Sequence, residues 1–158
     1  MKRFLENDYI VIAVRVFTGM LFIVASVDKV SLPDTFAASI ANYKIIPNGL
    51  ELSIATVLPW VELLSGLGIL AGVFFRGSAL ITSALSAVFL IAVASALARG
   101  LDIACGCFSQ DPSVGRVNWE KLVENVVLTA FSFYLLFSKS DKFKLQSSLR
   151  QNPAQKTV

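Results

Sequence analysis

The residues best suited to chemistry in this sequence are two cysteines separated by one glycine, Cys105-Gly106-Cys107. Side chains two positions apart in a helix point about 200° away from each other, so a helix would keep the two sulfurs apart. Gly106 permits the unusual backbone angles that a disulfide across one residue needs. Such a tight ring departs from relaxed disulfide geometry, and strain makes a disulfide easier to reduce. The spacing therefore favours a redox-active pair over a structural cross-link, which gains little from closing so short a loop.

Two other interpretations of the cysteines remain open. They fit buried, unreactive thiols, and they fit soft ligands for a metal such as copper(I). The chain has no histidine, and its two methionines, Met1 and Met20, lie far from the cysteines in sequence. A complete metal site is therefore hard to build within this chain, and we predict none.

The composition is that of a membrane protein. Hydrophobic residues make up 55% of the 158 residues, charged residues only 16%, and the mean hydropathy is +0.68. A typical soluble domain has roughly 25% charged residues. The net charge of +3 comes without a basic stripe interleaved with aromatic residues, which argues against a nucleic-acid binder. We expect the main partner of this surface to be the lipid bilayer.

Four long apolar segments must position the cysteines. A helix needs about 20 residues to cross the bilayer core, and no segment alternates apolar and polar residues as a membrane barrel would. We predict an all-α integral membrane four-helix bundle over residues 1–138, with loops at 28–49 and 98–118 and a polar basic tail at 139–158. The predicted helices cover residues 9–27, 50–75, 78–97 and 119–137.

The distribution of lysine and arginine predicts the orientation of this bundle. With four crossings, eight positive residues share the side of both termini: Lys2, Arg3, Arg76, Lys139, Lys142, Lys144, Arg150 and Lys156. Five lie on the other side: Lys29, Lys44, Arg99, Arg116 and Lys121. We therefore expect both termini in the cytoplasm, in a bacterial-type inner membrane. The cysteine loop then faces the periplasm or the exterior, where disulfides persist.

Two ionisable residues lie inside the predicted spans. Such residues are costly in a membrane and usually face the bundle interior with a partner, so we predict that Arg15 pairs with Glu62. The alternative is that Arg15 reaches the interface alone and Glu62 is protonated. Pro59 tends to kink the second helix beside Trp60, which either lines a cavity there or only packs or lies in lipid. Gly66, Gly68 and Gly72 allow close helix approach, including a contact of small residues at Gly68 and Gly72.

Two polar residues are expected on the cysteine side of the membrane. Lys29 follows the first helix, where its charge would lower the pKa of a nearby thiol and raise the thiolate fraction. An interfacial anchor is an equally good interpretation of Lys29. Tyr43 is consistent with a site residue and with the aromatic belt at a membrane interface.

Several short motifs occur in a set order along the chain: the first-helix pattern from Arg15 to Asp28-Lys29, Phe36 and Ile40 before Tyr43-Lys44-Ile45-Ile46-Pro47, Leu58-Pro59-Trp60-Val61-Glu62 with Gly66 and Gly72, Arg99-Gly100 and Cys105-Gly106-Cys107-Phe108. In this order and spacing they resemble the DoxX/MauE group of small redox-associated membrane proteins, and most closely its MauE branch, which is linked to disulfide formation in periplasmic proteins. The resemblance implies a four-helix membrane bundle similar to the core of vitamin K epoxide reductase-type enzymes, which pass electrons from thiols to a quinone. Ser109 and Glu124 depart from the family pattern.

We predict a membrane thiol–disulfide oxidoreductase that exchanges electrons between Cys105/Cys107 and a dithiol partner outside the cytoplasm, such as a thioredoxin-like protein. No covalent cofactor is expected. The resemblance implies a membrane quinone, for which the candidate binding residues are Trp60, Glu62, Arg15 and Tyr43. Either direction of electron flow fits the sequence. The alternatives are a non-enzymatic membrane subunit or assembly factor of a larger complex, and the small membrane subunit of a sulfur-compound quinone oxidoreductase.

Overall fold

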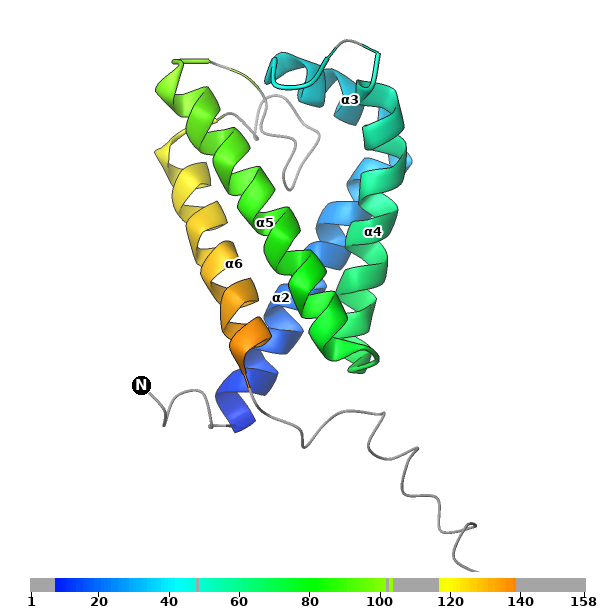
Figure 1. Ribbon diagram of the computed structural model, residues 1–158, viewed down its shortest axis with the longest axis vertical. Helices are drawn as coiled ribbons and strands as arrows, with labels where there is room; N and C mark the ends of the chain where they lie inside the picture. The colour runs from blue at the N-terminus through cyan, green and yellow to red at the C-terminus, as the bar shows by residue number, and fades with distance from the viewer. Residues whose placement is uncertain (1–7, 48, 102, 104–116, 139–158) are drawn as a thin grey trace, which may run out of the picture.

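The computed structural model describes residues 8–47, 49–101, 103 and 117–138, and within them every regular element is helical (Figure 1). The two cysteines and the tail lie outside these residues. The helices are α2 (Asp8–Ser31), α3 (Pro33–Asn42), α4 (Glu51–Ala71), α5 (Phe75–Ala98) and α6 (Trp119–Phe137).

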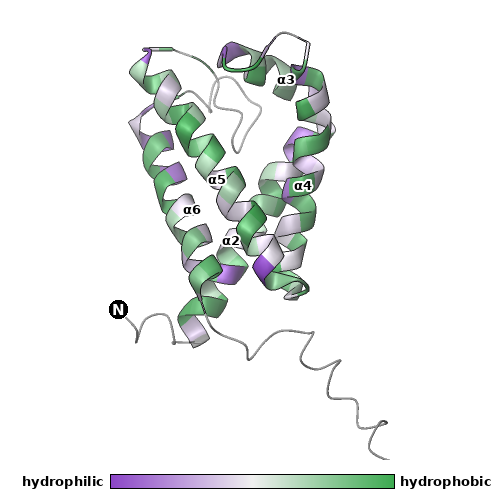
Figure 2. Ribbon diagram, in the orientation of Figure 1, coloured by the Kyte–Doolittle hydropathy of each residue, from purple (hydrophilic) through white to green (hydrophobic). Residues whose placement is uncertain are grey.

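The helical surface is that of a membrane protein. Among the described residues, three segments are long and apolar enough to cross a membrane: Tyr9–Ser31, Glu51–Ala71 and Phe75–Ala98. Figure 2 shows hydrophobic residues along most of the length of the four long helices. Large apolar side chains are exposed, with Leu64 at 66% and Ile91 at 67%, whereas many serines and threonines are buried. The predicted all-helical membrane character is therefore confirmed. The fourth span remains a prediction, because the first two turns of α6 contain three charged residues.

The four long helices form two antiparallel pairs. α2 packs along α4, and α5 packs along α6 (Figure 1). α2 begins and α6 ends at the same end of the bundle, at the bottom of the view in Figure 1. α3 lies at the opposite end, against α4. This arrangement places the C-terminal end of α2, the start of α4 and the end of α5 near α3.

A contact between two glycines brings α2 and α4 close together. A Cβ added at Gly66 would lie 3.1 Å from the carbonyl oxygen of Gly19, so no larger residue fits without a shift. Small residues let helix backbones approach in this way inside membranes. The predicted close approach is confirmed at Gly66 and at Gly68, where an added Cβ would overlap the Ser78 hydroxyl of α5. Gly72 instead ends α4 in the left-handed conformation, at φ 70°, and donates its N–H to the carbonyl of Gly68.

We expected the segment 28–49 to be a loop, but much of it is helical. α2 extends into it and ends at Ser31, and α3 follows from Pro33 to Asn42. Pro33 stands at the start of α3, where its missing N–H costs nothing, and Asp34 complements the helix dipole there. Phe36 is 1% exposed and docks the helix on the bundle. A helix of ten residues is too short to appear in the sequence as a membrane-spanning apolar segment. Most of the stability of so short a helix comes from its packing on the rest of the protein.

Small polar residues join α5 to α6. The hydroxyl oxygens of Ser86 and Ser132 are 3.3 Å apart, and the Thr129 hydroxyl lies 3.3 Å from the Ser86 carbonyl oxygen. The Thr129 hydroxyl also donates to the Asn125 carbonyl of its own helix, at 2.7 Å. Serine and threonine can be buried in an apolar helix because their hydroxyls donate hydrogen bonds to the backbone carbonyls three or four residues earlier. The contact between α5 and α6 is therefore made in part by polar but uncharged groups.

Candidate functional site

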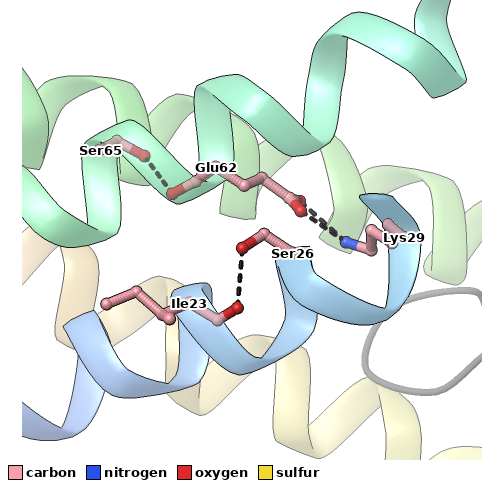
Figure 3. A network of polar contacts seen from close by, with 5 residues as sticks. All are labelled: Ile23, Ser26, Lys29, Glu62 and Ser65. Atoms are coloured by element: carbon pink, nitrogen blue, oxygen red, sulfur yellow. Dashed lines mark hydrogen bonds and ion pairs between the residues drawn. The ribbon is translucent and has the colours of Figure 1, made fainter. Parts of the chain in front are cut away.

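A buried ion pair joins the two helices that pack on each other most extensively. Lys29 lies in the last turn of α2, and its ammonium nitrogen is 2.9 and 2.8 Å from the two carboxylate oxygens of Glu62 on α4 (Figure 3). The two side chains are only 2% and 3% exposed. A buried charge is tolerated when it is paired with an opposite charge, so each residue makes the position of the other possible.

The inward positions of both helices recur at alternating intervals of three and four residues, which is the pattern of helices packed along a seam. Lys29 and Glu62 both occupy such positions, which along α2 include Thr18, Phe22, Ala25 and Lys29 and along α4 include Ala55, Pro59, Glu62, Gly66 and Ile69. Side chains on a helix lean toward its N-terminus. The ammonium of Lys29 therefore reaches back along α2 to the level of Glu62.

The predicted pairing of Arg15 with Glu62 is wrong. Arg15 donates from Nε to the carbonyl of Ile69 at 2.5 Å and from Nη2 to that of Leu70 at 2.8 Å. The last turn of a helix leaves carbonyls without helical partners, and Arg15 supplies donors for two of them. Because the helices are antiparallel, Arg15 lies level with the end of α4. Glu62 lies about two turns away, roughly 10 Å along the axis.

Two aromatic rings complete the surroundings of Lys29. Its ammonium lies 5.1 Å from the ring centre of Phe36 on α3 and 4.6 Å from that of Phe89 on α5. A cation within about 6 Å of a ring face is attracted by the ring's quadrupole. The hydroxyl of Ser26 donates to the Ile23 carbonyl, and that of Ser65 donates to the backbone carbonyl of Glu62 (Figure 3). Both hydroxyls therefore bond to backbone carbonyls, whereas the Glu62 carboxylate accepts from Lys29. Lys29 thus contacts three other helices.

A small cavity borders the ion pair on its inner side. Its volume is about 20 Å³, and its polar wall is formed by Lys29, Glu62, Ser86 and Asn125. One water needs roughly 10–15 Å³ and two to four polar partners. These four residues come from four different helices, so the space has the size and the chemistry of a single water site at the centre of the bundle.

A larger cavity of about 250 Å³ lies between α3, α4 and α5. Phe36 and Phe89 belong to its wall as well as to the surroundings of Lys29, so the two rings lie between the ammonium and the cavity. Tyr43, at the end of α3, also lines it and is 8% exposed. Burial disfavours the phenolate and raises the pKa of Tyr43 to about 12. Its phenol is therefore protonated at any physiological pH.

The segment that carries the cysteines is attached at this end of the bundle. The backbone N–H of Val117 donates to the carbonyl of Ile103 at 2.9 Å, which joins the two ends of the segment. Ile103 and Val117 also share a hydrophobic cluster with Tyr43. The guanidinium of Arg99 donates to the Tyr43 carbonyl. Both ends of the 104–116 segment are thereby anchored beside α3, and Cys105 and Cys107 themselves lie outside the described residues.

The structure brings some of the predicted site residues together and separates others. Glu62 binds Lys29, whose ammonium faces Phe36 and Phe89, and Tyr43 lines the same cavity as these two rings. Trp60 is 52% exposed on α4, because it follows the buried Pro59 directly and successive residues of a helix point about 100° apart. Arg15 is level with the far end of α4. These two residues therefore do not form one site with Tyr43.

Sequence reasoning missed the part played by three residues. They are Phe36, Phe89 and Asn125, which line the two cavities. Asn125 carried a signal, since an amide in an apolar helix usually faces the interior. Phe36 belongs to the motifs that carry the family resemblance, although its contact with Lys29 was not predicted. Phe89 carried no signal, because twelve phenylalanines occur in the chain and most positions suit them equally.

Comparison of the sequence with known proteins identifies the family to which it is similar. The sequence pattern described as "Methylamine utilisation protein MauE" matches residues 7–138. The protein of that name from Paracoccus denitrificans is 31% identical over 133 residues, which cover 84% of this chain and 71% of the relative. Its namesake from Methylophilus methylotrophus is 26% identical over 136 residues, covering 85% and 72%. That from Paracoccus versutus is 32% identical over 133 residues, covering 84% and 71%. No solved structure matches the chain.

Proposed function

Because this chain belongs to the MauE family of methylamine utilisation proteins, we propose that it is a membrane component of methylamine utilisation whose chemistry is thiol–disulfide exchange at Cys105 and Cys107. The observation that carries the proposal is the anchoring of the cysteine segment. Its two ends are joined by the bond between Val117 and Ile103 and are packed against Tyr43. The two described residues that flank the cysteine segment are thus fixed at one end of the bundle, which supports a function for this segment at that end.

The exchange proceeds in two steps that balance. A thiolate of the partner attacks one sulfur of the Cys105–Cys107 disulfide, which breaks that bond and forms a mixed disulfide between the two proteins. The second thiolate of the partner then displaces the cysteine of this chain. The partner leaves with a new disulfide, and Cys105 and Cys107 are left as two thiols that hold the two electrons.

The orientation that this chemistry needs is the one predicted from the charges. α6 crosses the membrane beside α5 as a fourth span, both termini lie in the cytoplasm, and α3 and the cysteine segment lie on the periplasmic or exterior side of an inner membrane. The packing of α5 on α6 supports the fourth crossing. Burial of Lys29 against Glu62 removes one exposed positive charge from the outer side, which strengthens the bias toward a cytoplasmic Arg76.

Reduced cysteines must be oxidised again before a second turnover. In the membrane the available class of two-electron acceptor is a quinone, which takes two electrons and two protons and leaves as a quinol. The two thiols supply both, so the balance closes without a further reactant. The direction from partner to quinone is the one that makes disulfides outside the cytoplasm.

The experiment uses the full chain in lipid nanodiscs with a reduced thioredoxin-like protein as reporter. We expect the oxidised protein to convert the reporter dithiol to a disulfide, and the Cys105→Ser/Cys107→Ser variant to have lost this activity. Ser109→Ala, in the same segment, is the matched control and keeps it. A reporter that keeps only one of its two cysteines should accumulate the mixed disulfide with the unaltered chain, because it lacks the second thiolate that would displace Cys105 or Cys107.

An unchanged rate of reporter oxidation in the double variant would overturn the proposal. If that variant also supports methylamine utilisation in cells, the chain acts as a non-enzymatic subunit or assembly factor. The name shared by its relatives suits that function equally well. Co-purification of the double variant with the same membrane proteins as the unaltered chain would establish it.

A further inference from the structure

We propose that the 250 Å³ cavity between α3, α4 and α5 is the seat of a quinone ring, held between Phe36, Tyr43 and Phe89 with its tail in the surrounding lipid. The redox role of this seat rests on the proposed function. The existence of the seat rests on the shape and the lining of the cavity, and it can be tested without any thiol.

The cavity has the size of a substituted ring. A cavity of about 150 Å³ is enough to hold benzene, and pockets for small ligands start at about 300 Å³. A volume of about 250 Å³ therefore admits one six-membered ring with its substituents, and an isoprenoid tail must lie elsewhere. Phe36 and Phe89 form part of the wall, so a ring in the cavity would pack against aromatic side chains, and aromatic pairs gain more than simple burial provides.

The polar groups of the wall are few, as a quinone requires. Among the described residues that line the cavity, Ser39 and Tyr43 carry hydroxyls and the others are apolar. The Tyr43 phenol stays protonated, since its pKa is raised to about 12, so it remains a hydrogen-bond donor suited to a carbonyl oxygen. A polar redox carrier such as a nicotinamide nucleotide would leave many buried groups without partners there, which is costly.

The ligand reaches this cavity from the bilayer. Val88 on α5 and Ile45 beyond α3 both line the cavity, and they are 64% and 54% exposed on the apolar surface of the protein. The edge between α4 and α5 is therefore a lateral entrance for a lipid-soluble molecule. This favours a membrane-resident quinone over a carrier dissolved in water.

The cavity also borders the anchor of the cysteine segment. Tyr43, Phe89 and Ala92 line the cavity and contribute to the hydrophobic cluster that contains Ile103. Under the proposed function, the two thiols of Cys105 and Cys107 would give two electrons and two protons to the quinone, which forms their disulfide and leaves a quinol.

The test measures binding of decylubiquinone to the protein in phosphatidylcholine nanodiscs. Ala92→Leu fills the cavity, and Ala94→Leu adds the same atoms to the exposed face of the same helix. Ala92→Leu takes up space that the ring would occupy, so it should weaken binding roughly tenfold or more, which is about 1.4 kcal/mol per factor of ten, while Ala94→Leu leaves binding unchanged. Should Ala92→Leu fail to fold, Ile40→Phe narrows the cavity from α3, with exposed Ile91→Phe as its control.

The Cys105→Ser/Cys107→Ser variant separates this inference from the proposed function. Its binding of decylubiquinone should equal that of the unaltered chain, because the described residues that line the cavity form its wall without a cysteine. Exchange with the reporter could fail while decylubiquinone still binds the unaltered chain and no longer binds Ala92→Leu. That result would support the quinone site and contradict the thiol–disulfide function. Equal binding in Ala92→Leu and Ala94→Leu overturns the seat. So does displacement of decylubiquinone by decane at equal concentration, which would make the cavity a site for lipid chains.

Discussion

The ammonium of Lys29 lies 2.9 and 2.8 Å from the two oxygens of the Glu62 carboxylate, in a part of the bundle where both side chains are almost completely buried. The bond joins the last turn of α2 to the middle of α4. Removing one partner from such a pair leaves a buried charge without compensation, which costs more than removing both. Four helices meet at this pair, since Phe36 and Phe89 lie against the same ammonium.

Glu62→Gln should destabilise the protein by about 3–5 kcal/mol, because it leaves the Lys29 ammonium buried without its counter-charge. Adding Lys29→Met should restore most of this loss, whereas adding Arg15→Leu should not. The free energy of unfolding in mixed detergent micelles, taken through both double-mutant cycles, measures the two coupling energies. A coupling near zero for Lys29 and Glu62, or a larger one for Arg15 and Glu62, would contradict the observed pairing.

Gly66→Leu should separate α2 from α4, because any Cβ at position 66 already lies 3.1 Å from the Gly19 carbonyl oxygen. We expect a loss of about 1–3 kcal/mol in the free energy of unfolding, as for other overpacked positions. Gly77→Ala is the control, since a Cβ there meets no atom within 4 Å and alanine is the better helix former. Equal stability of Gly66→Leu and the unaltered protein would show that the two helices do not depend on this contact.

Tyr43→Phe should change how stability depends on alkaline pH. The folded protein holds the Tyr43 proton up to about pH 12, whereas the unfolded chain releases it near pH 10.0. The stability due to the raised pKa is therefore fully present below pH 10 and is lost as the pH rises to about 12, by up to about 2–3 kcal/mol.

The measurement is the difference in unfolding free energy between the unaltered protein and Tyr43→Phe across this range. Below pH 9 the difference should be constant and reflect only lost packing and hydrogen bonding. Between pH 10 and 12 it should shift in favour of Tyr43→Phe. A difference that stays constant up to pH 12 would mean that the phenol ionises as freely in the folded protein as in water.

Cys105 and Cys107 should react with a membrane-impermeant maleimide in cells whose outer membrane is permeabilised, after mild reduction. The proposed orientation requires this, because the segment that carries them is anchored at the α3 end of the bundle. A single cysteine placed at Arg76, at the other end, in the Cys105→Ser/Cys107→Ser background is the control and should react only after the inner membrane is lysed. The reverse pattern would invert the orientation.

Much of the architecture follows from the sequence alone. Spans of about 20 apolar residues can only be helices in a bilayer, because every backbone polar group there must be bonded within the segment. The scarcity of charges made the few that remain conspicuous, and Glu62 was identified as an interior residue needing a partner. The resemblance to MauE was also readable from the order of the motifs, and the match over residues 7–138 confirms it.

The partner of Glu62 was decided only by the tertiary structure. Arg15 and Lys29 lie fourteen residues apart, two heptads on one helix, so both fall on the same inward stripe and periodicity cannot choose between them. The choice depends on how far α4 slides along α2, and the contact of Gly19 with Gly66 sets that register. Once it is set, Arg15 meets the free carbonyls at the end of α4 and Lys29 reaches the carboxylate. A periodic pattern specifies which face of a helix is buried, whereas the axial position of a neighbouring helix depends on close packing between side chains far apart in the sequence.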